Sequence, residues 1–216
     1  MRLYITRHGK TVWNQEGRFQ GAKDSKLTEE GRQDAVTLGQ YIQKIPFNAV
    51  YTSPLGRAKA TTSLIFADRP WLIQEEPLLQ EMNFGALEGM KISEIADTYS
   101  DIYDRLWNHP EKFDRCPGGG ESYAEVTARV KQFLDRMADL KADENVFITT
   151  HGMYFIVLMG YIKGLQPKDF PLINRYVVRG CSLTCVSIDK NGYHILLEGD
   201  DHFLRDEARS TFLIQK

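Results

Sequence analysis

Residues 2–9 of the chain read Arg-Leu-Tyr-Ile-Thr-Arg-His-Gly. The part from Arg2 to Thr6 is rich in β-forming residues and lacks the strict apolar–polar alternation of a half-exposed strand, so it predicts a central strand that is buried on both faces. An arginine, a histidine and a glycine follow at once. Because ligands of open α/β sheets bind at the carboxyl ends of the strands, the stretch predicts that Arg7 and His8 lie at a binding site.

Two further β-rich runs have the same character. The run from Val146 to Thr150 ends in His151-Gly152 before a predicted helix. We expect this second histidine and the free N–H groups of that helix to face an anion. The run from Ala49 to Thr52 precedes a helix expected from Pro54 to Phe66, with Ser53 as its capping hydroxyl. Residues 71–74 are a weaker candidate for a fourth strand.

Amphipathic helices separate these strands. Thr28 is predicted to cap one helix, in which Ala35, Leu38, Ile42 and Ile45 recur at helical spacing. A capping-box pattern at residues 122–125 precedes a second helix, with apolar positions continuing to residue 140. A hairpin of residues 182–189 and 193–198 closes the chain, with Asn191-Gly192 as its turn.

This order of elements predicts an α/β fold: a three-layer sandwich with a mostly parallel central sheet flanked by helices. The chain has 216 residues, 42% of them hydrophobic and 26% charged, which is ordinary globular usage. We therefore expect a single domain over residues 1–216. Residues 85–120 contain four aromatic side chains and no clear strand, and they predict a helical lid or insertion over the active site.

The three strand ends bring together two arginines and two histidines. Arg57 falls in the first turn of the helix expected from Pro54, and it joins Arg7, His8 and His151. Arginine binds phosphate oxygens with a planar fork of donors. Histidine with its ordinary pKa is mostly neutral at pH 7 and can act as a nucleophile. The constellation therefore predicts a phosphoryl-binding site in which a histidine reacts, and a nearby carboxyl group is needed to protonate the leaving group.

Seven motifs extend this pattern along the chain. They are Arg7-His8-Gly9-x-Thr11-x-x-Asn14, Gln20-Gly21, Asp24-x-x-Leu27-Thr28-x-x-Gly31, Tyr51-Thr52-Ser53-Pro54-Leu55-x-Arg57-Ala58, Leu79-x-Glu81-x-x-x-Gly85-x-x-Glu88-Gly89, Gly119-Gly120-Glu121-Ser122 and Thr150-His151-Gly152. In this order they resemble the histidine phosphatase superfamily, branch 1, whose members are phosphoglycerate-mutase-like and carry the Arg-His-Gly (RHG) motif. Within that superfamily the chain is most similar to the small broad-specificity phosphatases.

The resemblance implies a role for each matching residue. His8 is the residue that is phosphorylated, and Glu81 is the proton donor and, after transfer, the base for water. Arg7, Arg57 and His151 bind the phosphoryl group with the support of Asn14. Further candidates for the pocket are Gln20, Gly21 and Gly152. No metal and no cofactor are implied, and the segment 118–121 is interpreted as structural.

Two positions depart from the family pattern. Lys10 stands where glutamate is common, and Lys26 stands where proline is common. We expect both to add positive charge near the mouth of the site. A metal site built from His8, His151 and His202 is a weaker hypothesis, because the chain lacks histidine pairs at ligand spacing.

We expect a metal-independent phosphatase that hydrolyses small phosphate monoesters through a phosphohistidine on His8. One alternative is a phosphoglycerate mutase that depends on 2,3-bisphosphoglycerate. The resemblance implies a longer chain with a middle insertion for that mutase. A second alternative is a weakly catalytic module that binds a phosphorylated metabolite. The matched site residues favour catalysis over mere binding.

The composition of the chain limits which binding partners and which cellular compartment we expect. A formal net charge of −2 argues against a nucleic-acid binder. The longest apolar run, residues 153–162, is too short for a membrane span and predicts a buried helix. Three cysteines and a start without a signal-peptide core favour the cytoplasm. The expected partner is a small phosphate monoester, and the oligomeric state is left open.

Overall fold

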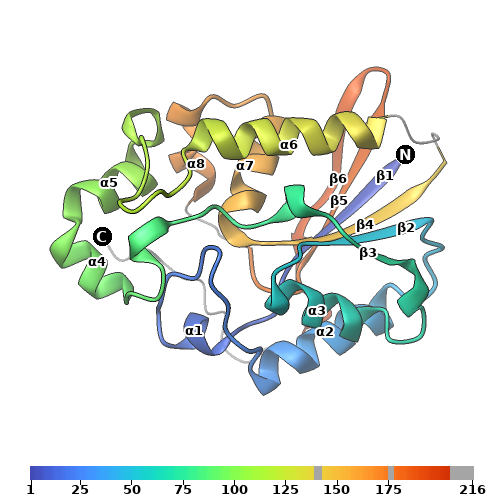
Figure 1. Cartoon of the computed structure of the whole chain (residues 1–216). Helices are drawn as coiled ribbons and strands as arrows, with labels where there is room; N and C mark the ends of the chain where they lie inside the picture. The colour runs from blue at the N-terminus through green and yellow to red at the C-terminus, as the bar shows by residue number, and fades with distance from the viewer. Residues whose placement is uncertain (139–142, 175–177, 205–216) are drawn as a thin grey trace.

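The computed structural model describes residues 1–138, 143–174 and 178–204. Within them, six strands form one sheet in the order β3-β2-β4-β1-β5-β6 (Figure 1). The strands are β1 (Arg2–Arg7), β2 (Ala49–Thr52), β3 (Ile73–Glu75), β4 (Asn145–Thr150), β5 (Leu183–Asp189) and β6 (Gly192–Asp200). The first four run parallel, and β5 and β6 add an antiparallel edge beside β1. The predicted mostly parallel sheet, with β1 and β4 at its centre, is confirmed.

Helices cover both faces of this sheet. The helices are α1 (Val12–Gln15), α2 (Glu29–Tyr41), α3 (Gly56–Ile65), α4 (Ile92–Thr98), α5 (Ser100–Asn108), α6 (Tyr123–Ala138), α7 (Gly152–Ile162) and α8 (Pro171–Asn174). Short 3₁₀ turns occur at Pro70–Leu72, Pro77–Leu79, Gly85–Leu87, Pro110–Lys112 and Pro167–Asp169. Helices α2 and α3 pack on one face, and α6 and α7 pack on the other (Figure 1). The predicted three-layer sandwich is therefore confirmed.

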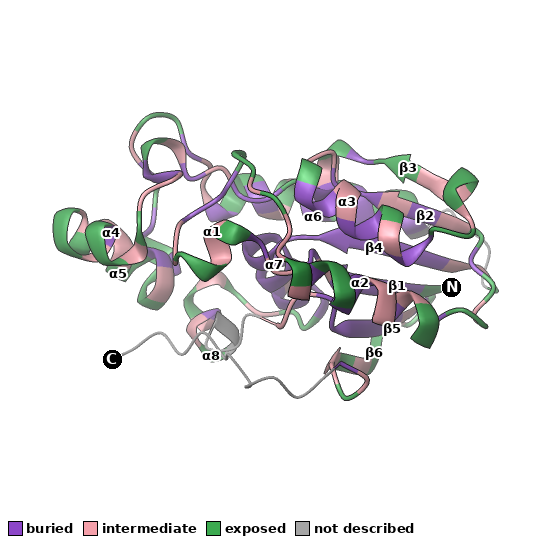
Figure 2. Cartoon of the chain, turned by 90° about the horizontal axis from the view of Figure 1, so that it is seen from below, coloured by how far each residue is buried: buried purple, intermediate pink, exposed green. Residues whose placement is uncertain are grey.

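The two faces of the sheet have separate cores, because side chains of one strand point alternately to either side. Leu3 and Ile5 of β1 join the core under α6 and α7, whereas Tyr4 joins the core over α2 and α3. Figure 2 shows that burial concentrates in the central strands and in α7, whereas α4 and α5 are largely exposed. The strands that deliver the predicted site residues are thus the most rigidly packed part of the molecule.

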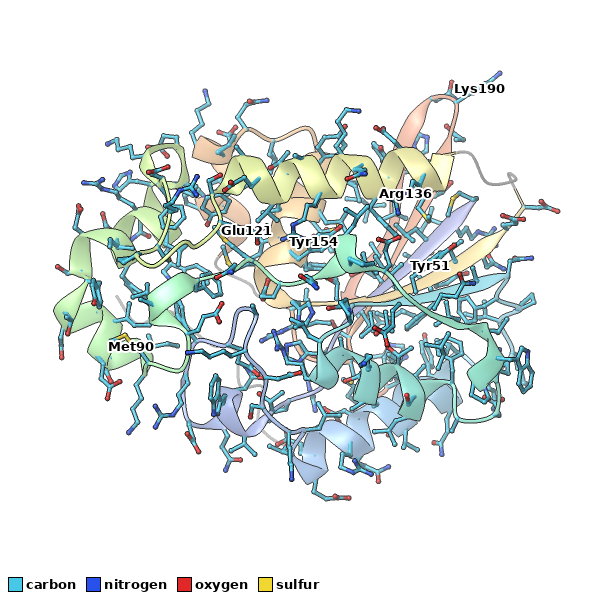
Figure 3. All side chains as sticks on the ribbon, in the orientation of Figure 1. Tyr51, Met90, Glu121, Arg136, Tyr154 and Lys190 are labelled. Carbon is cyan, nitrogen blue, oxygen red and sulfur yellow. The ribbon has the colours of Figure 1, made fainter. Side chains whose placement is uncertain are left out.

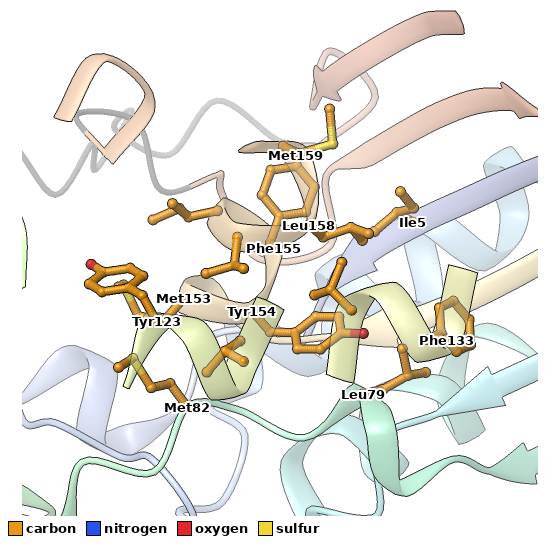
Figure 4. Close-up of a cluster of buried hydrophobic side chains, with 14 of the residues drawn as sticks. Ile5, Leu79, Met82, Tyr123, Phe133, Met153, Tyr154, Phe155, Leu158 and Met159 are labelled. Atoms are coloured by element: carbon orange, nitrogen blue, oxygen red, sulfur yellow. The ribbon is translucent and has the colours of Figure 1, made fainter. Parts of the chain in front are cut away.

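Helix α7 is almost entirely buried, as predicted from its continuous apolar run. Its side chains fill the space between the sheet and α6, where Tyr154 and Leu158 pack near Phe133 and Ile5 (Figure 4). In the described ranges of the chain, we find no helix with the length and apolarity that crossing a bilayer requires. The apolar run of residues 153–162 is therefore part of the hydrophobic core.

Two of the predicted helix starts are confirmed. The Thr28 hydroxyl accepts a hydrogen bond from the N–H of Gly31 (3.0 Å) and caps α2. Ser122 and Glu125 form the reciprocal bonds of a capping box at the start of α6. The apolar positions expected beyond Ala138, up to residue 140, lie outside the described residues.

Other boundaries differ from the predictions. Helix α3 begins at Gly56 and ends at Ile65, so the expected helix from Pro54 to Phe66 was wrong at both ends. Within the described residues, α3 has no side-chain cap, because its N-cap residue is Leu55; the Ser53 hydroxyl, two residues earlier, accepts the N–H of Leu55 (3.3 Å) and is also hydrogen-bonded to His151. Helix α2 ends at Tyr41, so the turn at Ile45 falls outside it. The fourth strand lies two residues later than predicted, because Pro70–Leu72 forms a 3₁₀ turn.

The segment 85–120 is helical in part. It contains α4, α5 and two of the 3₁₀ turns, and it lies beyond the end of the sheet (Figure 1). Lys91, Ile92, Tyr103 and Trp107 of this segment line the cavity described below. Its action as a lid stays a prediction.

Candidate active site

The register of the sheet brings three strand ends together. Arg7 of β1 is paired with Thr150 of β4, and Thr52 of β2 is paired with Thr149. The residues that follow these strand ends therefore lie side by side: His8 after β1, His151 after β4 and Ser53 after β2. The two imidazole rings lie 5.2 Å apart, centroid to centroid. A site assembled from residues far apart in sequence thus follows directly from strand order.

These strand ends open into a cavity of about 570 Å³. Predicted site residues that line it are Arg7, His8, Asn14, Gln20, Gly21, Arg57, Glu81 and Gly152. His151 lies directly behind His8 and is fully buried. The cavity has a second, apolar part, formed by Phe19, Phe84, Ile92, Ala96, Tyr103, Trp107 and Met153. A charged end and an apolar end therefore share one space.

The tautomer of His8 is set by its backbone neighbour. Its Nδ1 lies 2.8 Å from the carbonyl oxygen of Gly9, which can only accept, so Nδ1 carries the proton. Nε2 is consequently the unprotonated nitrogen, and its lone pair accepts a hydrogen bond from the Nε–H of Arg57 over 3.2 Å. Burial, followed by the charges of Arg57 and Arg7, holds the pKa of His8 well below its ordinary value of 6.5. His8 is therefore a neutral nucleophile at pH 7.

Gly9 is required by close packing rather than by its torsion angles. A Cβ at this position would lie 2.5 Å from the carbonyl oxygen of Gly31, a backbone atom that cannot move aside alone. The N–H of Gly9 donates to the hydroxyl of Thr61 (3.0 Å). These contacts hold the backbone that orients the His8 ring.

Arg57 is buried and largely committed to the loop that follows α1. Its Nη1 donates to the carbonyl of Lys23 (2.7 Å) and to the carboxylate of Asp24 (3.1 Å), and its Nη2 donates to the carbonyl of Gly21 (2.8 Å). With the bond to His8, four of its five N–H groups are engaged. The guanidinium therefore offers a phosphoryl group a fixed positive charge and one remaining donor.

Among the described residues, two of the buried side-chain nitrogens without a hydrogen-bond partner belong to predicted site residues. One is Nε of Arg7, whose Nη1 donates to the carbonyl of Val178 (3.1 Å). The other is Nδ1 of His151, whose Nε2 lies 2.7 Å from the Ser53 hydroxyl. Burial and the nearby charge of Arg57 lower the pKa of His151 well below its ordinary value. Unpaired buried donors are costly, and an anion held between them would satisfy both.

Glu81 is held at the start of α7. Its carboxylate accepts hydrogen bonds from the backbone N–H groups of Met82 (2.9 Å), Tyr154 (3.0 Å) and Met153 (3.2 Å). The expectation that the first N–H groups of this helix are free for an anion is therefore corrected. A carboxylate of the protein occupies them, because acidic side chains are stabilised at a helix N-terminus. The bonds fix Glu81 at the wall of the cavity.

The remaining predicted pocket residues support the loop around Arg57. The side-chain oxygens of Asn14 and Gln20 both accept a hydrogen bond from the Thr11 hydroxyl, at 3.0 and 3.1 Å. Gly21 has a φ of 58°, and a Cβ there would lie 2.0 Å from a carboxylate oxygen of Glu88. Asn14 and Gln20 keep their amide N–H groups available to a ligand.

Our interpretation of the sequence gave Ser53 only the role of a helix cap and gave Glu88 no role, although both stand in the quoted motifs. Ser53 orients His151, as described above. Glu88 is buried and accepts hydrogen bonds from the N–H groups of Ala22 (2.8 Å) and Lys23 (3.2 Å), so it fixes the loop that holds Arg57. Their membership of the motifs was the available signal. No sequence signal indicated that Tyr103 and Trp107 of α5 line the cavity, because their contact with it depends on tertiary packing.

The charge expected near the mouth from the two departing lysines needs correction. Lys10 forms an ion pair with Glu30 (2.6 Å), so its charge is compensated, and neither Lys10 nor Lys26 is among the described residues that line the cavity. Arg18 and Lys91 lie at the cavity instead. His202 pairs with Asp200 on the surface and is not close enough to contribute to the site. Across residues 1–138, 143–174 and 178–204, no group of His, Cys, Asp and Glu side chains is arranged to hold a metal ion.

Residues 3–201 match the family model of the histidine phosphatase superfamily (branch 1). The chain belongs to this superfamily, whose members are phosphatases and mutases, and the predicted family is confirmed.

Curated relatives carry mutase names. A probable phosphoglycerate mutase, GpmB, of Erwinia tasmaniensis is 32% identical over 213 residues, which cover 96% of this chain and 97% of the relative. A 2,3-bisphosphoglycerate-dependent phosphoglycerate mutase of Lachnoclostridium phytofermentans is 29% identical over 237 residues, covering 95% of this chain and 94% of the relative. Among solved structures, YhfR of Bacillus stearothermophilus has a TM-score of 0.87 and 33% identity, covering 94% of this chain and 99% of that one.

Proposed function

We propose that the protein is a metal-independent phosphatase that hydrolyses small phosphate monoesters through a phosphohistidine on His8. The observation that carries this proposal is the state of His8. Its ring is neutral, its unprotonated Nε2 carries the lone pair that would attack phosphorus, and that lone pair accepts a hydrogen bond from the buried guanidinium of Arg57. Such an arrangement combines a nucleophile with the positive charge that phosphoryl transfer requires.

In the first step, Nε2 of His8 attacks phosphorus, and the bond from phosphorus to the alcohol oxygen breaks. Glu81 in its acid form gives its proton to that oxygen, so the alcohol leaves neutral. In the second step, Glu81 takes a proton from water, and the resulting hydroxide displaces His8 from phosphorus. Inorganic phosphate is released, and both residues return to their starting states.

Positive charge converges on the phosphoryl group in both steps. A phosphate monoester carries about −1.5 to −2 charges near neutral pH. Arg57 is buried and Arg7 is half-buried, and both are held by backbone carbonyls, so they need little rearrangement when charge develops on the transferring oxygens. The unpaired Nε of Arg7 and Nδ1 of His151 supply donors to those oxygens.

The mutase is the second candidate, and the names of the relatives favour it. Arg18 and Lys91 at the cavity could hold a second anionic group. Two observations favour the phosphatase. Beyond the predicted phosphoryl-binding residues, the cavity wall is mainly apolar and aromatic and includes the acidic Glu16, whereas both substrates of a phosphoglycerate mutase are strongly anionic. The alignment with the Lachnoclostridium mutase also spans 237 residues, more than the 216 of this chain, so that relative carries sequence that is absent here.

One experiment separates these functions. The purified protein is incubated in EDTA with p-nitrophenyl phosphate, and in parallel with 3-phosphoglycerate and 2,3-bisphosphoglycerate. The phosphatase requires release of phosphate that His8→Ala abolishes. Interconversion of phosphoglycerates that is faster than phosphate release would establish the mutase. Binding of phosphate esters without turnover of any of them would support the alternative of a module that only binds a phosphorylated metabolite.

Trapping the intermediate identifies the nucleophile. Acid-labile label from a ³²P-labelled substrate should map to His8, and label on any other residue would overturn the assignment. We also propose the cytoplasm as the compartment of this reaction. The support is that Cys116, Cys181 and Cys185 are buried free thiols, which suit a reducing environment.

A further inference from the structure

We propose that Arg129 and Glu121 form a positioning pair that sets the orientation of Glu81 for proton transfer. This inference rests on the proposed function, in which Glu81 is the proton donor. Neither residue lines the cavity in the described part of the chain, and the motif that contains Glu121 has no role in the chemistry given above. Their effect would therefore reach the substrate only through Glu81.

Arg129, on α6, uses its whole guanidinium to hold the segment that carries Glu81. Nη1 donates to the carbonyl oxygens of Leu78 (2.9 Å) and Gln80 (3.0 Å), and Nη2 approaches that of Glu81 itself (3.5 Å). Nε and Nη2 form a two-point ion pair with the Glu121 carboxylate, at 2.9 and 3.0 Å. The side chain is only 20% exposed, so most of these bonds are partly shielded from water, although the one to Gln80 is exposed.

Glu121 holds the other end of the same segment. Its carboxylate accepts a hydrogen bond from the N–H of Asn83 (2.9 Å), and its own N–H donates to the Asn83 carbonyl (2.8 Å). The ion pair with Arg129 therefore joins the backbone before Glu81 to the backbone after it. Residues 78–83 contain only the end of a 3₁₀ turn, so their polar groups depend on partners of this kind.

A second contact links the pair to the carboxylate of Glu81. The Arg129 guanidinium lies over the ring of Tyr154, 5.5 Å from its centroid, and the N–H of Tyr154 donates to Glu81 (3.0 Å). Figure 3 shows Glu121 at the start of α6 and Tyr154 beneath that helix. Arg129 thus contacts the main chain of Glu81 and also the residue that binds its side chain.

Proton transfer is sensitive to such positioning. A general acid must lie within hydrogen-bond distance of the leaving oxygen, and a displacement of about 1 Å can cost roughly a hundredfold in rate. Loss of the Arg129–Glu121 pair is therefore expected to lower kcat/KM most for substrates whose leaving group most needs a proton. A clamp that merely stabilises the fold would affect all substrates alike.

The experiment uses a series of substituted phenyl phosphates, from p-nitrophenyl phosphate to phenyl phosphate, with the full-length protein. We compare kcat/KM, because it reports the step in which the alcohol leaves. The variants are Arg129→Met and Arg129→Lys, with Glu81→Gln as the reference for a lost proton donor. Lysine keeps the charge and the bulk but cannot bridge three carbonyls and a carboxylate.

Arg136→Met is the matched control. Arg136 lies on the same helix (Figure 3) and pairs with Glu76 (2.9 Å), whose carboxylate accepts the N–H of Leu78 (3.0 Å). The ratio of kcat/KM between two substrates does not depend on the fraction of folded enzyme. A partly unfolded variant therefore still gives a valid answer.

We expect both Arg129 variants to lower kcat/KM for phenyl phosphate about tenfold more than for p-nitrophenyl phosphate, in the same direction as Glu81→Gln. Arg136→Met should leave this ratio unchanged. If Glu81→Gln changes the ratio and the Arg129 variants do not, the positioning role is wrong. An equal change in Arg136→Met would also overturn it. If Glu81→Gln itself leaves the ratio unchanged, the proton-donor role in the proposed function fails instead.

Discussion

The Nε–H of Arg57 donates to Nε2 of His8 over 3.2 Å, and both side chains are buried. A permanent cation next to the reacting nitrogen keeps the imidazole neutral, because a proton there would face a like charge at close range. The same guanidinium lies where negative charge accumulates during phosphoryl transfer. In the proposed reaction, this one contact would both keep the nucleophile deprotonated and place positive charge beside the phosphoryl group.

This relationship predicts that stability falls in mild acid. The pKa of His8 is lowered in the folded protein, so its contribution to the free energy of unfolding is fully present above the unfolded value of about 6.5 and is lost as the pH falls below it. The loss is up to about 1.4 kcal/mol per pH unit. Urea unfolding between about pH 7.5 and 5.5 should show a steeper decline in the wild type than in His8→Asn. Parallel declines would contradict the assigned protonation state.

Ser53→Ala tests the support of His151. The Ser53 hydroxyl is fully buried and lies 2.7 Å from Nε2 of His151, so its removal leaves that ring nitrogen unpaired. We expect a loss of about 1–3 kcal/mol in the free energy of unfolding and about a tenfold decrease in kcat/KM, since the ring is no longer held in one tautomer. The control is Ser63→Ala, at an exposed position on α3. Equal effects of the two substitutions would refute the role of Ser53.

Gly21→Ala tests the loop that holds Arg57. Alanine at a φ of 58° costs about 1–2 kcal/mol, and its Cβ would also collide with the buried carboxylate of Glu88. Gly164→Ala is a matched control, because Gly164 has a φ of 68°, has open space around it and is not among the described residues that line the cavity. We expect Gly21→Ala to be the more destabilising of the two in urea unfolding, and to be alone in lowering kcat/KM. Similar losses would show that strain, rather than the contact with Glu88, matters there.

Trp107→Leu tests the apolar end of the cavity. Trp107 and Tyr103 lie 6.3 Å apart, centroid to centroid, in the wall provided by α5. A smaller side chain should weaken binding of an aromatic leaving group by about 1–2 kcal/mol. The KM for naphthyl phosphate should therefore rise roughly five- to thirtyfold, whereas that for glycerol phosphate should change little. Trp71→Leu, at a residue that is 75% exposed, is the control. A rise in KM for both substrates would argue against an apolar subsite.

Local patterns in the sequence were sufficient to predict the central strands, the caps at Thr28 and Ser122 and the buried helix that follows His151. These features depend on contacts within about four residues, such as a hydroxyl that accepts the N–H of a nearby residue. The order of motifs was also sufficient to indicate which side chains would meet at the strand ends. Here the reason is that parallel strands share one carboxyl edge.

Tertiary structure alone decided how those side chains are used. Ser53 binds His151 across 98 positions and does not cap α3, and Glu81 binds the first N–H groups of α7, which we expected to be free. Lys10 is neutralised by Glu30 rather than directed at the site. A polar group selects its partner by distance and burial, and both are set by strand order and packing between segments that are remote in sequence. The sequence by itself therefore determined which residues form the site, and the folded chain determined their hydrogen-bond partners.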